Sequence, residues 1–283
     1  MHRLHSHMLN IAQGFRVYLG NVPVDLLPFD ESLGRIESFI RNGASQHTAQ
    51  QRNSHQVLTP HHRPAHQIVT LNSLMFNHTF FDKQLLQAIT TASLVLPDSV
   101  GIVLGSYLCV FNKPDRPLSR LPARIAGIDL MLKLCKISQE KGYRIYLLGT
   151  KPDILPEAAL VLRKMFPNLN IVGFYHGYFD KQQETGIFRD IKQKSPDIVF
   201  VGLSVPRQEK WIHSNLNKFH CPVVMGVGGS FDVIAGRLHR APEFLRRFGL
   251  EWFYRFLQEP WRIVRIKDLP VSFCRILSCS LLR

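Results

Sequence analysis

The chain alternates short, almost continuously apolar runs with longer amphipathic stretches, and this alternation restricts its fold more than any other feature. The apolar runs lie at residues 67–72, 94–98, 143–150, 169–179, 197–204 and 222–229. Strands without polar alternation are typical of parallel sheets, which helices cover on both faces. Intervening helices supply the crossovers that parallel strands require. The sequence therefore predicts an α/β fold, with a Rossmann-like, mostly parallel sheet and helices on both faces.

Composition divides the 283 residues into three parts. Residues 1–15 form an N-terminal tail, residues 16–235 the α/β domain, and residues 236–283 a small helical C-terminal appendage. At the start of the domain we expect one strand over 16–27 and a helix over 30–43, with Gly43 as its stop signal.

Residues 44–66 interrupt this regular pattern. They contain five histidines, many glutamines and no acid, so we expect a mobile insertion. A metal-binding histidine tract is the alternative, but the histidine spacing matches no ordinary ligand set.

The charge balance points to an anionic partner. The formal net charge is +14, which is compatible with nucleic acid, a membrane surface or a phosphorylated substrate. Residues 236–283 alone carry ten Arg or Lys, four acids and eight aromatic side chains. The five cysteines form no CxxC pair, which favours a reducing cytosol. The sequence contains no run of 18 apolar residues, so we expect no membrane-spanning helix.

The predicted strands end in polar or glycine-rich residues. In an open α/β sheet ligands bind beyond the carboxyl ends of the strands, so these exits are candidates for one shared site. They contain Thr70 and Asn72, Asp98, Gly149, Gly177 and Tyr178, Gly202 with Gln208, and Gly228 with Asp232.

Familiar cofactor and metal motifs are missing from the sequence. The loop "GVGGSFD" at 226–232 fits neither the dinucleotide fingerprint nor the Walker A pattern, and none of the twelve aspartates stands two residues from another. We therefore expect no cofactor and no metal ion, and expect arginines and helix N-termini to bind any diphosphate.

Eight blocks in order resemble the WecG/TagA/CpsF family of bacterial glycosyltransferases. They are "TLN" (70–72), "LVLPDSVGIVL" (94–104), "RIAGIDLM" (124–131), "YRIYLLGTKP" (143–152), "NIVGFYHGYF" (170–179), "PDIVFVGLSVPRQEKWI" (196–212), "VVMGVGGSFDVIAGRLHRAP" (223–242) and "GLEWFYRFLQEPWR" (249–262). The resemblance implies an inverting enzyme. Such an enzyme moves a sugar of the N-acetylmannosamine type, or a related hexose, from a UDP-sugar to a glycan acceptor carried on a polyprenyl diphosphate.

The resemblance also implies roles for individual residues. Asp98 matches the proposed catalytic base, and Arg124 a pocket arginine that assists at the diphosphate or the acceptor. The other implied positions are Thr70 and Asn72 in the substrate pocket, Gly177, Tyr178, Gln208 and Asp232 at the UDP-sugar, and Arg255, Arg262 and Arg265 in an appendage that faces the site and the membrane.

Taken alone, the residues leave alternatives open. Asp98 and Asp232 are also in position to cap helices, and Arg124 fits an ordinary surface arginine. The whole chain also fits another nucleotide-binding enzyme, an epimerase or a dehydrogenase, or a basic nucleic-acid-binding protein, although it carries no nucleic-acid motif. We expect surface polysaccharide or wall polymer synthesis at the inner face of the plasma membrane, with an anionic membrane surface rather than nucleic acid as partner. A homo-oligomer stays open.

Overall fold

The computed structural model describes residues 15–51, 64–111, 123–247, 250–258 and 268–281. Its centre is a six-stranded sheet in the order β4-β3-β8-β7-β5-β6, in which every neighbouring pair is parallel. The strands are β3 (His66–Leu71), β4 (Leu94–Pro97), β5 (Arg144–Gly149), β6 (Asn170–Tyr175), β7 (Ile198–Gly202) and β8 (Val223–Gly226). The predicted α/β fold with a parallel sheet is confirmed.

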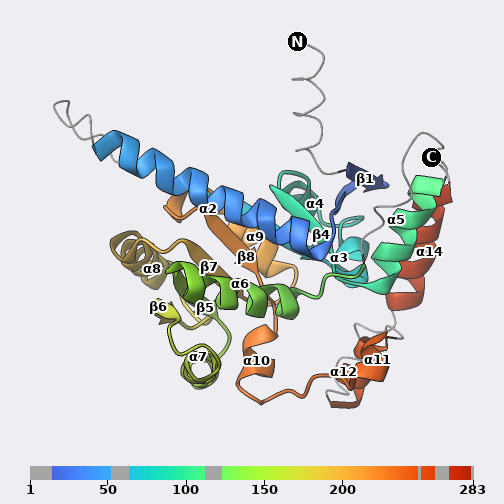
Figure 1. The fold of residues 1–283 in the computed structure, drawn as a ribbon. Helices are drawn as coiled ribbons and strands as arrows, with labels where there is room; N and C mark the ends of the chain where they lie inside the picture. The colour runs from blue at the N-terminus through green and yellow to red at the C-terminus, as the bar shows by residue number, and fades with distance from the viewer. Residues whose placement is uncertain (1–14, 52–63, 112–122, 248–249, 259–267, 282–283) are drawn as a thin grey trace, which may run out of the picture.

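Helices cover both faces of the sheet, as Figure 1 shows. One face packs against α2 (Phe29–Gln51), α6 (Gly127–Lys141) and α7 (Ile154–Met165). The other face packs against α3 (Ser73–His78), α4 (Lys83–Thr90), α5 (Val100–Phe111), α8 (Lys181–Lys194) and α9 (Arg207–Ser214), and a short 3₁₀ turn, η2 (Leu216–Lys218), follows α9.

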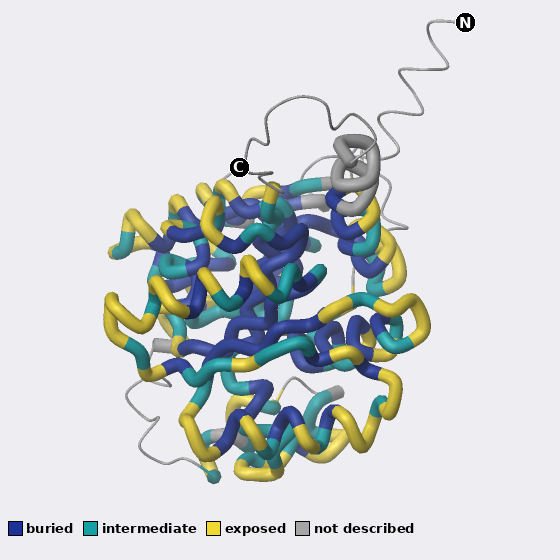
Figure 2. The backbone as a smooth tube through the Cα atoms, turned by 90° about the vertical axis from the view of Figure 1, so that its left-hand side faces the viewer, coloured by how far each residue is buried: buried dark blue, intermediate teal, exposed yellow. Residues whose placement is uncertain are grey.

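The two faces explain why the strands are apolar throughout. Ile145 and Leu147 of β5 belong to the core under α2, α6 and α7, whereas Tyr146 and Leu148 belong to the core under α8 and α9. Successive strand residues point to opposite faces, so a sheet with helices on both sides buries almost every position of its inner strands, whereas the edge strand β6 is only partly buried. Figure 2 shows the resulting buried centre inside exposed outer helices.

The N-terminal segment forms a hairpin instead of the single strand that we expected over 16–27. β1 (Phe15–Leu19) and β2 (Val22–Leu26) pair antiparallel around Gly20 and Asn21. A two-residue loop of this composition is a known hairpin signal, which the single-strand prediction overlooked.

A buried aspartate of the hairpin ties it to the edge of the large sheet. Asp25 accepts hydrogen bonds from Arg16 Nε at 2.7 Å and from the backbone amide of Val95, in the edge strand β4, at 2.7 Å. The hairpin thereby occupies a donor that an edge strand would otherwise expose.

The predicted end of the first helix at Gly43 is wrong. α2 continues to Gln51, so residues 44–51 of the expected insertion are helical, while residues 52–63 lie outside the described part. Gly43 has a packing role: a Cβ at this position would lie 2.7 Å from the ring of Pro222. The glycine therefore lets the helix approach the chain just before β8, and it does not terminate the helix.

The C-terminal region begins with three short helices, α10 (Ser230–Ile234), α11 (Glu243–Arg247) and α12 (Glu251–Gln258), and ends with α14 (Asp268–Leu281). α14 lies against α3 and α5 and buries Ile276 completely in their core. Arg275 of the same helix donates to Asn77 Oδ1 at 2.5 Å and stacks over Phe80 and Phe81. The end of the chain is therefore integrated with the α/β body.

Across the stretches that the structure describes, no helix combines the length and the apolar character needed to cross a bilayer.

Candidate active site

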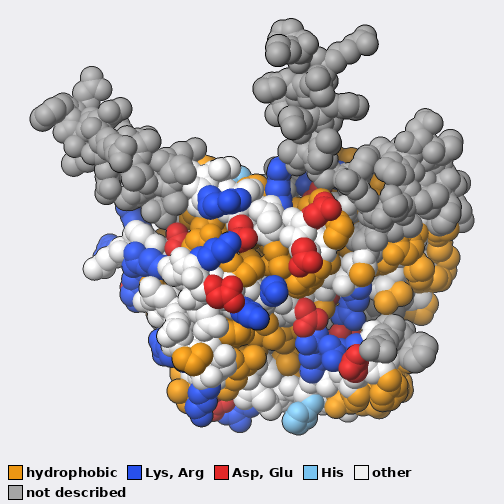
Figure 3. Space-filling model, viewed as in Figure 1, with side chains coloured by type: hydrophobic (Ala, Val, Ile, Leu, Met, Phe, Trp, Pro, Cys, Tyr) orange, Lys and Arg blue, Asp and Glu red, His pale blue; other side chains and the backbone are white. Residues whose placement is uncertain are grey.

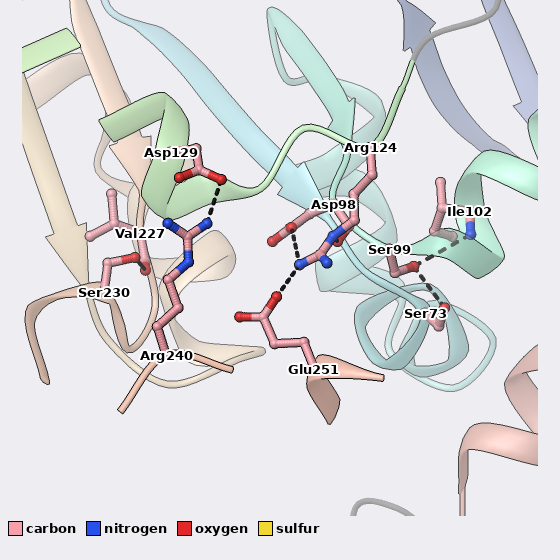
Figure 4. Close-up of polar contacts among 10 residues, drawn as sticks. All are labelled: Ser73, Asp98, Ser99, Ile102, Arg124, Asp129, Val227, Ser230, Arg240 and Glu251. Carbon is pink, nitrogen blue, oxygen red and sulfur yellow. Dashed lines mark hydrogen bonds and ion pairs between the residues drawn. The ribbon is translucent and has the colours of Figure 1, made fainter. Parts of the chain in front are cut away.

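Three charged side chains meet where β4 ends, and they come from three distant parts of the chain. Arg124 Nε donates to the backbone carbonyl of Asp98 at 2.8 Å, and its Nη2 lies 3.5 Å from Asp98 Oδ1. The same Nη2 donates to Glu251 Oε2, at the start of α12, at 2.5 Å. Figure 4 shows the guanidinium between the two carboxylates.

This cluster is half-buried. About a fifth of the Arg124 and Asp98 side chains is exposed, 22% and 23%, although the Oδ1 atom of Asp98 is itself buried. Burial disfavours the charged guanidinium, but Asp98 and Glu251 together outweigh it and raise the pKa of Arg124. Arg124 therefore remains a permanent positive charge beside Asp98.

The polypeptide after β4 fixes the position of Asp98. Its backbone amide donates to Leu71 O at the end of β3 at 2.8 Å, which prolongs the β3–β4 pairing by one residue. Ser99 supplies the capping contact for α5, because its Oγ accepts from Ile102 N at 3.4 Å and contacts Ser73 Oγ at 2.8 Å. In this arrangement the carboxylate of Asp98 faces Arg124 (Figure 4).

Thr70 and Asn72 lie beside this cluster at the end of β3. Thr70 is buried against the first residue of α6, where a Cβ on Gly127 would lie 2.9 Å from Thr70 Oγ1. The side chain of Asn72 caps α3, accepting from Met75 N at 2.9 Å. Thr70 thus lies at the start of α6. Because Gly127 has no Cβ, there is room there for the threonine hydroxyl.

Gln208 joins the exits of β7 and β8. Its Oε1 accepts from Leu203 N at 3.2 Å and from Gly228 N at 2.9 Å, and the side chain is buried. Gln208 is therefore placed to set the shape of both loops.

A buried acid orients this glutamine. Glu209 Oε1 accepts from Gln208 Nε2 at 2.7 Å, and Glu209 itself is 2% exposed. Glu209 Oε2 and the Oε1 atom of nearby Gln67 are both buried acceptors with no hydrogen-bond donor among the described residues. Burial raises the pKa of Glu209 to about 7. Its protonated form, which carries a donor, suits these surroundings better than the carboxylate does.

The exits of β5, β6 and β8 are joined in the same way. Thr150, which follows β5, donates through its hydroxyl to Asp232 Oδ1 in the first turn of α10 at 3.1 Å. Gly177, which follows β6, donates its amide to Thr150 O at 2.8 Å, and the neighbouring Tyr178 is exposed. Asp232, Gly177 and Tyr178 therefore surround one stretch of the carboxyl edge.

The arginines expected from the appendage lie largely outside the described part. Arg255 falls within α12, but its side chain is not described, and Arg262 and Arg265 lie in the undescribed stretch 259–267. Their assignment stays a prediction.

Sequence reasoning missed three charged residues of this edge: Glu251, Arg240 and Asp129. Arg240 Nη2 forms an ion pair with Asp129 Oδ2 in the first turn of α6, beside the Arg124 cluster in Figure 4. All three stand inside the quoted family blocks, but nothing in their local pattern signals that the tail folds back onto α6 and β4. Figure 3 shows acidic and basic side chains intermingled on this face of the molecule.

Within the described ranges, no three His, Cys, Asp or Glu side chains gather in a way that could hold a metal ion.

The carboxylate–guanidinium cluster lies at the carboxyl edge of a parallel sheet, which is where open α/β proteins bind their ligands. The model of the WecG/TagA/CpsF glycosyl transferase family matches residues 17–283. The chain therefore belongs to this family and is a glycosyltransferase, which decides against the epimerase and dehydrogenase alternatives.

Two curated proteins that are similar to this chain carry the same name. An N-acetylglucosaminyldiphosphoundecaprenol N-acetyl-β-D-mannosaminyltransferase from Bacillus subtilis (strain 168) is 36% identical over 203 residues, covering 72% of this chain and 75% of the relative. A protein of the same name from Staphylococcus aureus (strain MW2) is 36% identical over 209 residues, covering 74% of this chain and 78% of the relative.

The buried acid Glu209 predicts a pH dependence of stability. Its pKa in the folded protein, about 7, lies above the ordinary glutamate value, so the folded state binds the proton more tightly than the unfolded state. We expect the contribution of Glu209 to the free energy of unfolding to be complete at pH values below the ordinary glutamate pKa and to decline as pH rises toward 7. Glu209→Gln, which imitates the neutral acid, should flatten this decline in urea unfolding measured between pH 5 and 8.

Glu184→Gln, on the neighbouring α8, serves as the control and should keep the wild-type pH profile. An unchanged slope in Glu209→Gln would show that Glu209 is not the group that titrates.

Proposed function

We propose that the protein transfers an N-acetylmannosamine-type sugar, with inversion, from a UDP-sugar to a glycan acceptor on a polyprenyl diphosphate. The observation that carries this proposal is the Asp98–Arg124 pair at the β4 exit, a base candidate and a permanent cation within 3.5 Å of each other. The names of the relatives support the acceptor class and the sugar. Such a product belongs to surface polysaccharide or wall polymer synthesis.

Asp98 acts as the general base in this proposal. Its carboxylate accepts the proton of the acceptor hydroxyl while the hydroxyl oxygen forms a bond to the anomeric carbon of the donor. The bond from that carbon to the diphosphate oxygen breaks, and its electron pair leaves with UDP. Attack opposite the departing group inverts the configuration. A base must lie within hydrogen-bond reach of the hydroxyl, and the partly exposed carboxylate of Asp98 is accessible for this.

Arg124 stabilises negative charge during the transfer. The departing diphosphate gains charge, and a guanidinium offers up to five N–H donors in a fixed planar array. Arg124 lies beside the first turn of α6, a 15-residue helix, and the partial positive charge of a helix N-terminus favours an anion in the same place. We therefore assign Arg124 to a diphosphate of the substrates.

The other exits supply the binding surface. Gly177, Tyr178, Gln208 and Asp232 are assigned to the UDP-sugar. Thr70 and Asn72 are assigned to the pocket beside the base. The hydrogen bonds of Gln208 to the loops after β7 and β8 give it an indirect part, because it fixes backbone that the nucleotide would contact.

The first test removes the base. Asp98→Asn keeps the size of the side chain but cannot accept the proton, so we expect a ~10²–10⁴-fold lower rate of UDP release with a short-chain polyprenyl-diphosphate acceptor. Asp153→Asn, at the exposed start of α7, is the control and should transfer at the wild-type rate. Transfer by Asp98→Asn within a few-fold of wild type would refute the assignment.

The second test concerns metal. Because Arg124 and the α6 N-terminus are assigned to the diphosphate, we expect transfer to continue at an undiminished rate after exhaustive treatment with EDTA. The measurement is UDP release before and after chelation. A rate that EDTA abolishes and that Mg²⁺ or Mn²⁺ restores would contradict this expectation.

We further propose that the enzyme works peripherally at the inner face of the plasma membrane, where the tail meets an anionic surface. Phe244 of α11, and Trp252, Phe253 and Leu257 of α12, are exposed apolar side chains on a strongly basic tail. Hydrophobic side chains gather along the right-hand edge of Figure 3, where Figure 1 places α5, α12 and α14. Such a surface binds anionic lipid through apolar insertion and electrostatic attraction together.

The third test uses vesicles. Full-length protein should bind phosphatidylglycerol vesicles in a salt-sensitive way and phosphatidylcholine vesicles weakly. Leu257→Ser should weaken this binding, whereas Leu160→Ser, an equally exposed leucine on α7, should not. Equal binding by all three proteins would remove α12 from the lipid contact.

A further inference from the structure

Glu251, the acid at the start of α12, occupies the Nη2 atom of Arg124, which a substrate anion would need. Glu251 takes a hydrogen bond from Nη2 at 2.5 Å, while Nε is committed to the Asp98 carbonyl at 2.8 Å. The Glu251 side chain is only 13% exposed, so this ion pair is more shielded from solvent than an ordinary surface pair. The contact joins α12 directly to the base candidate through a shared guanidinium.

The ion pairs described around this contact carry no excess of positive charge. The charged side chains in Figure 4 are Asp98, Asp129 and Glu251 against Arg124 and Arg240, three negative and two positive, which sums to −1. A diphosphate ester brings at least two further negative charges. Like charges placed together at a partly buried site repel one another, so an arriving diphosphate and the Glu251 carboxylate compete for Arg124.

We propose that Glu251 is a latch: in the substrate-free enzyme its carboxylate occupies the diphosphate position on Arg124, and a substrate diphosphate displaces it and frees the start of α12. The identity of the ligand rests on the proposed function. The displaced contact is a single ion pair, so exchange replaces one carboxylate on Arg124 by a phosphate oxygen and breaks no covalent bond.

The remaining contacts of the tail define which part moves. Gln258, at the far end of α12, exchanges two hydrogen bonds with the backbone of His239, at 2.7 and 2.9 Å. Arg240 stays paired with Asp129. These contacts do not involve Arg124, so the end of α12 remains attached when Glu251 is released, and its first turn then keeps its link to α11, such as the hydrogen bond from Leu250 N to Leu245 O at 2.8 Å.

The test compares diphosphate binding by wild type and Glu251→Gln. Glutamine keeps the shape of the side chain but removes the competing charge, so the variant should bind a diphosphate at least about five-fold more tightly, within the usual range of coupling between two linked events. UDP and geranyl diphosphate are titrated separately by calorimetry. The ligand whose affinity rises identifies the donor or the acceptor as the displacing substrate.

The matched control is Glu157→Gln. Glu157 also forms an arginine ion pair between distant segments, with Arg237 at 2.7 Å, but this pair is exposed and involves neither Arg124 nor Asp98. The control should bind both diphosphates as wild type does.

Hydrogen exchange supplies a readout of the latch itself. In the wild type, the displacing diphosphate should lower the protection of amides in the first turn of α12, and Glu251→Gln should show lowered protection without ligand. Equal affinities in wild type and variant, or a first turn of α12 that gains protection with ligand, would overturn the latch and leave the proposed function standing. Failure of the wild type and the variant to bind either diphosphate would overturn both.

Discussion

Parallel pairing of all six strands is the constraint on which the site depends. It brings the carboxyl ends of β3 to β8 to one edge, so that residues more than a hundred positions apart in the chain become neighbours. Side chains then connect the strand exits: Gln208 joins the loops after the neighbouring strands β7 and β8, and Asp232, after β8, is joined to Thr150, after β5, across the intervening β7. The carboxyl edge of the sheet thereby carries linked polar side chains, and the apolar core lies beneath it. The loops have little freedom of their own, which favours precise placement of a reacting group.

Much of this architecture was predictable from local sequence, for identifiable reasons. The strands are uniformly apolar because both faces are covered, and that pattern is visible without knowing their order. The two wrong predictions concern residues whose type is compatible with two structural roles. Gly43 was expected to stop a helix, yet it serves close packing on Pro222, and that contact joins residues far apart in the sequence. The hairpin at Gly20 and Asn21 was a local signal that was read as a continuous strand.

The candidate site was predictable only in part. Asp98 and Arg124 could be proposed from their family blocks, and the structure brings them together at the β4 exit. The strand order that makes their neighbours meet was not available from spacing, since crossovers in a parallel sheet can join strands in several orders. Glu251 illustrates the limit. It lies in an ordinary amphipathic helix, and only the path of the tail reveals that its carboxylate reaches Arg124. Glu209, in the first turn of α9, is buried and orients Gln208.

The packing of α14 has a consequence for how this chain is made. Ile276 fills the core between α3 and α5, and α14 also contacts β1 at the opposite end of the described sequence. Domains form progressively during synthesis, the N-terminal part first. The core under the hairpin lacks the side chain of Ile276 until α14 has been synthesised. A nascent chain that has not yet reached α14 therefore leaves uncovered the apolar side of α5 against which Ile276 packs in the folded protein.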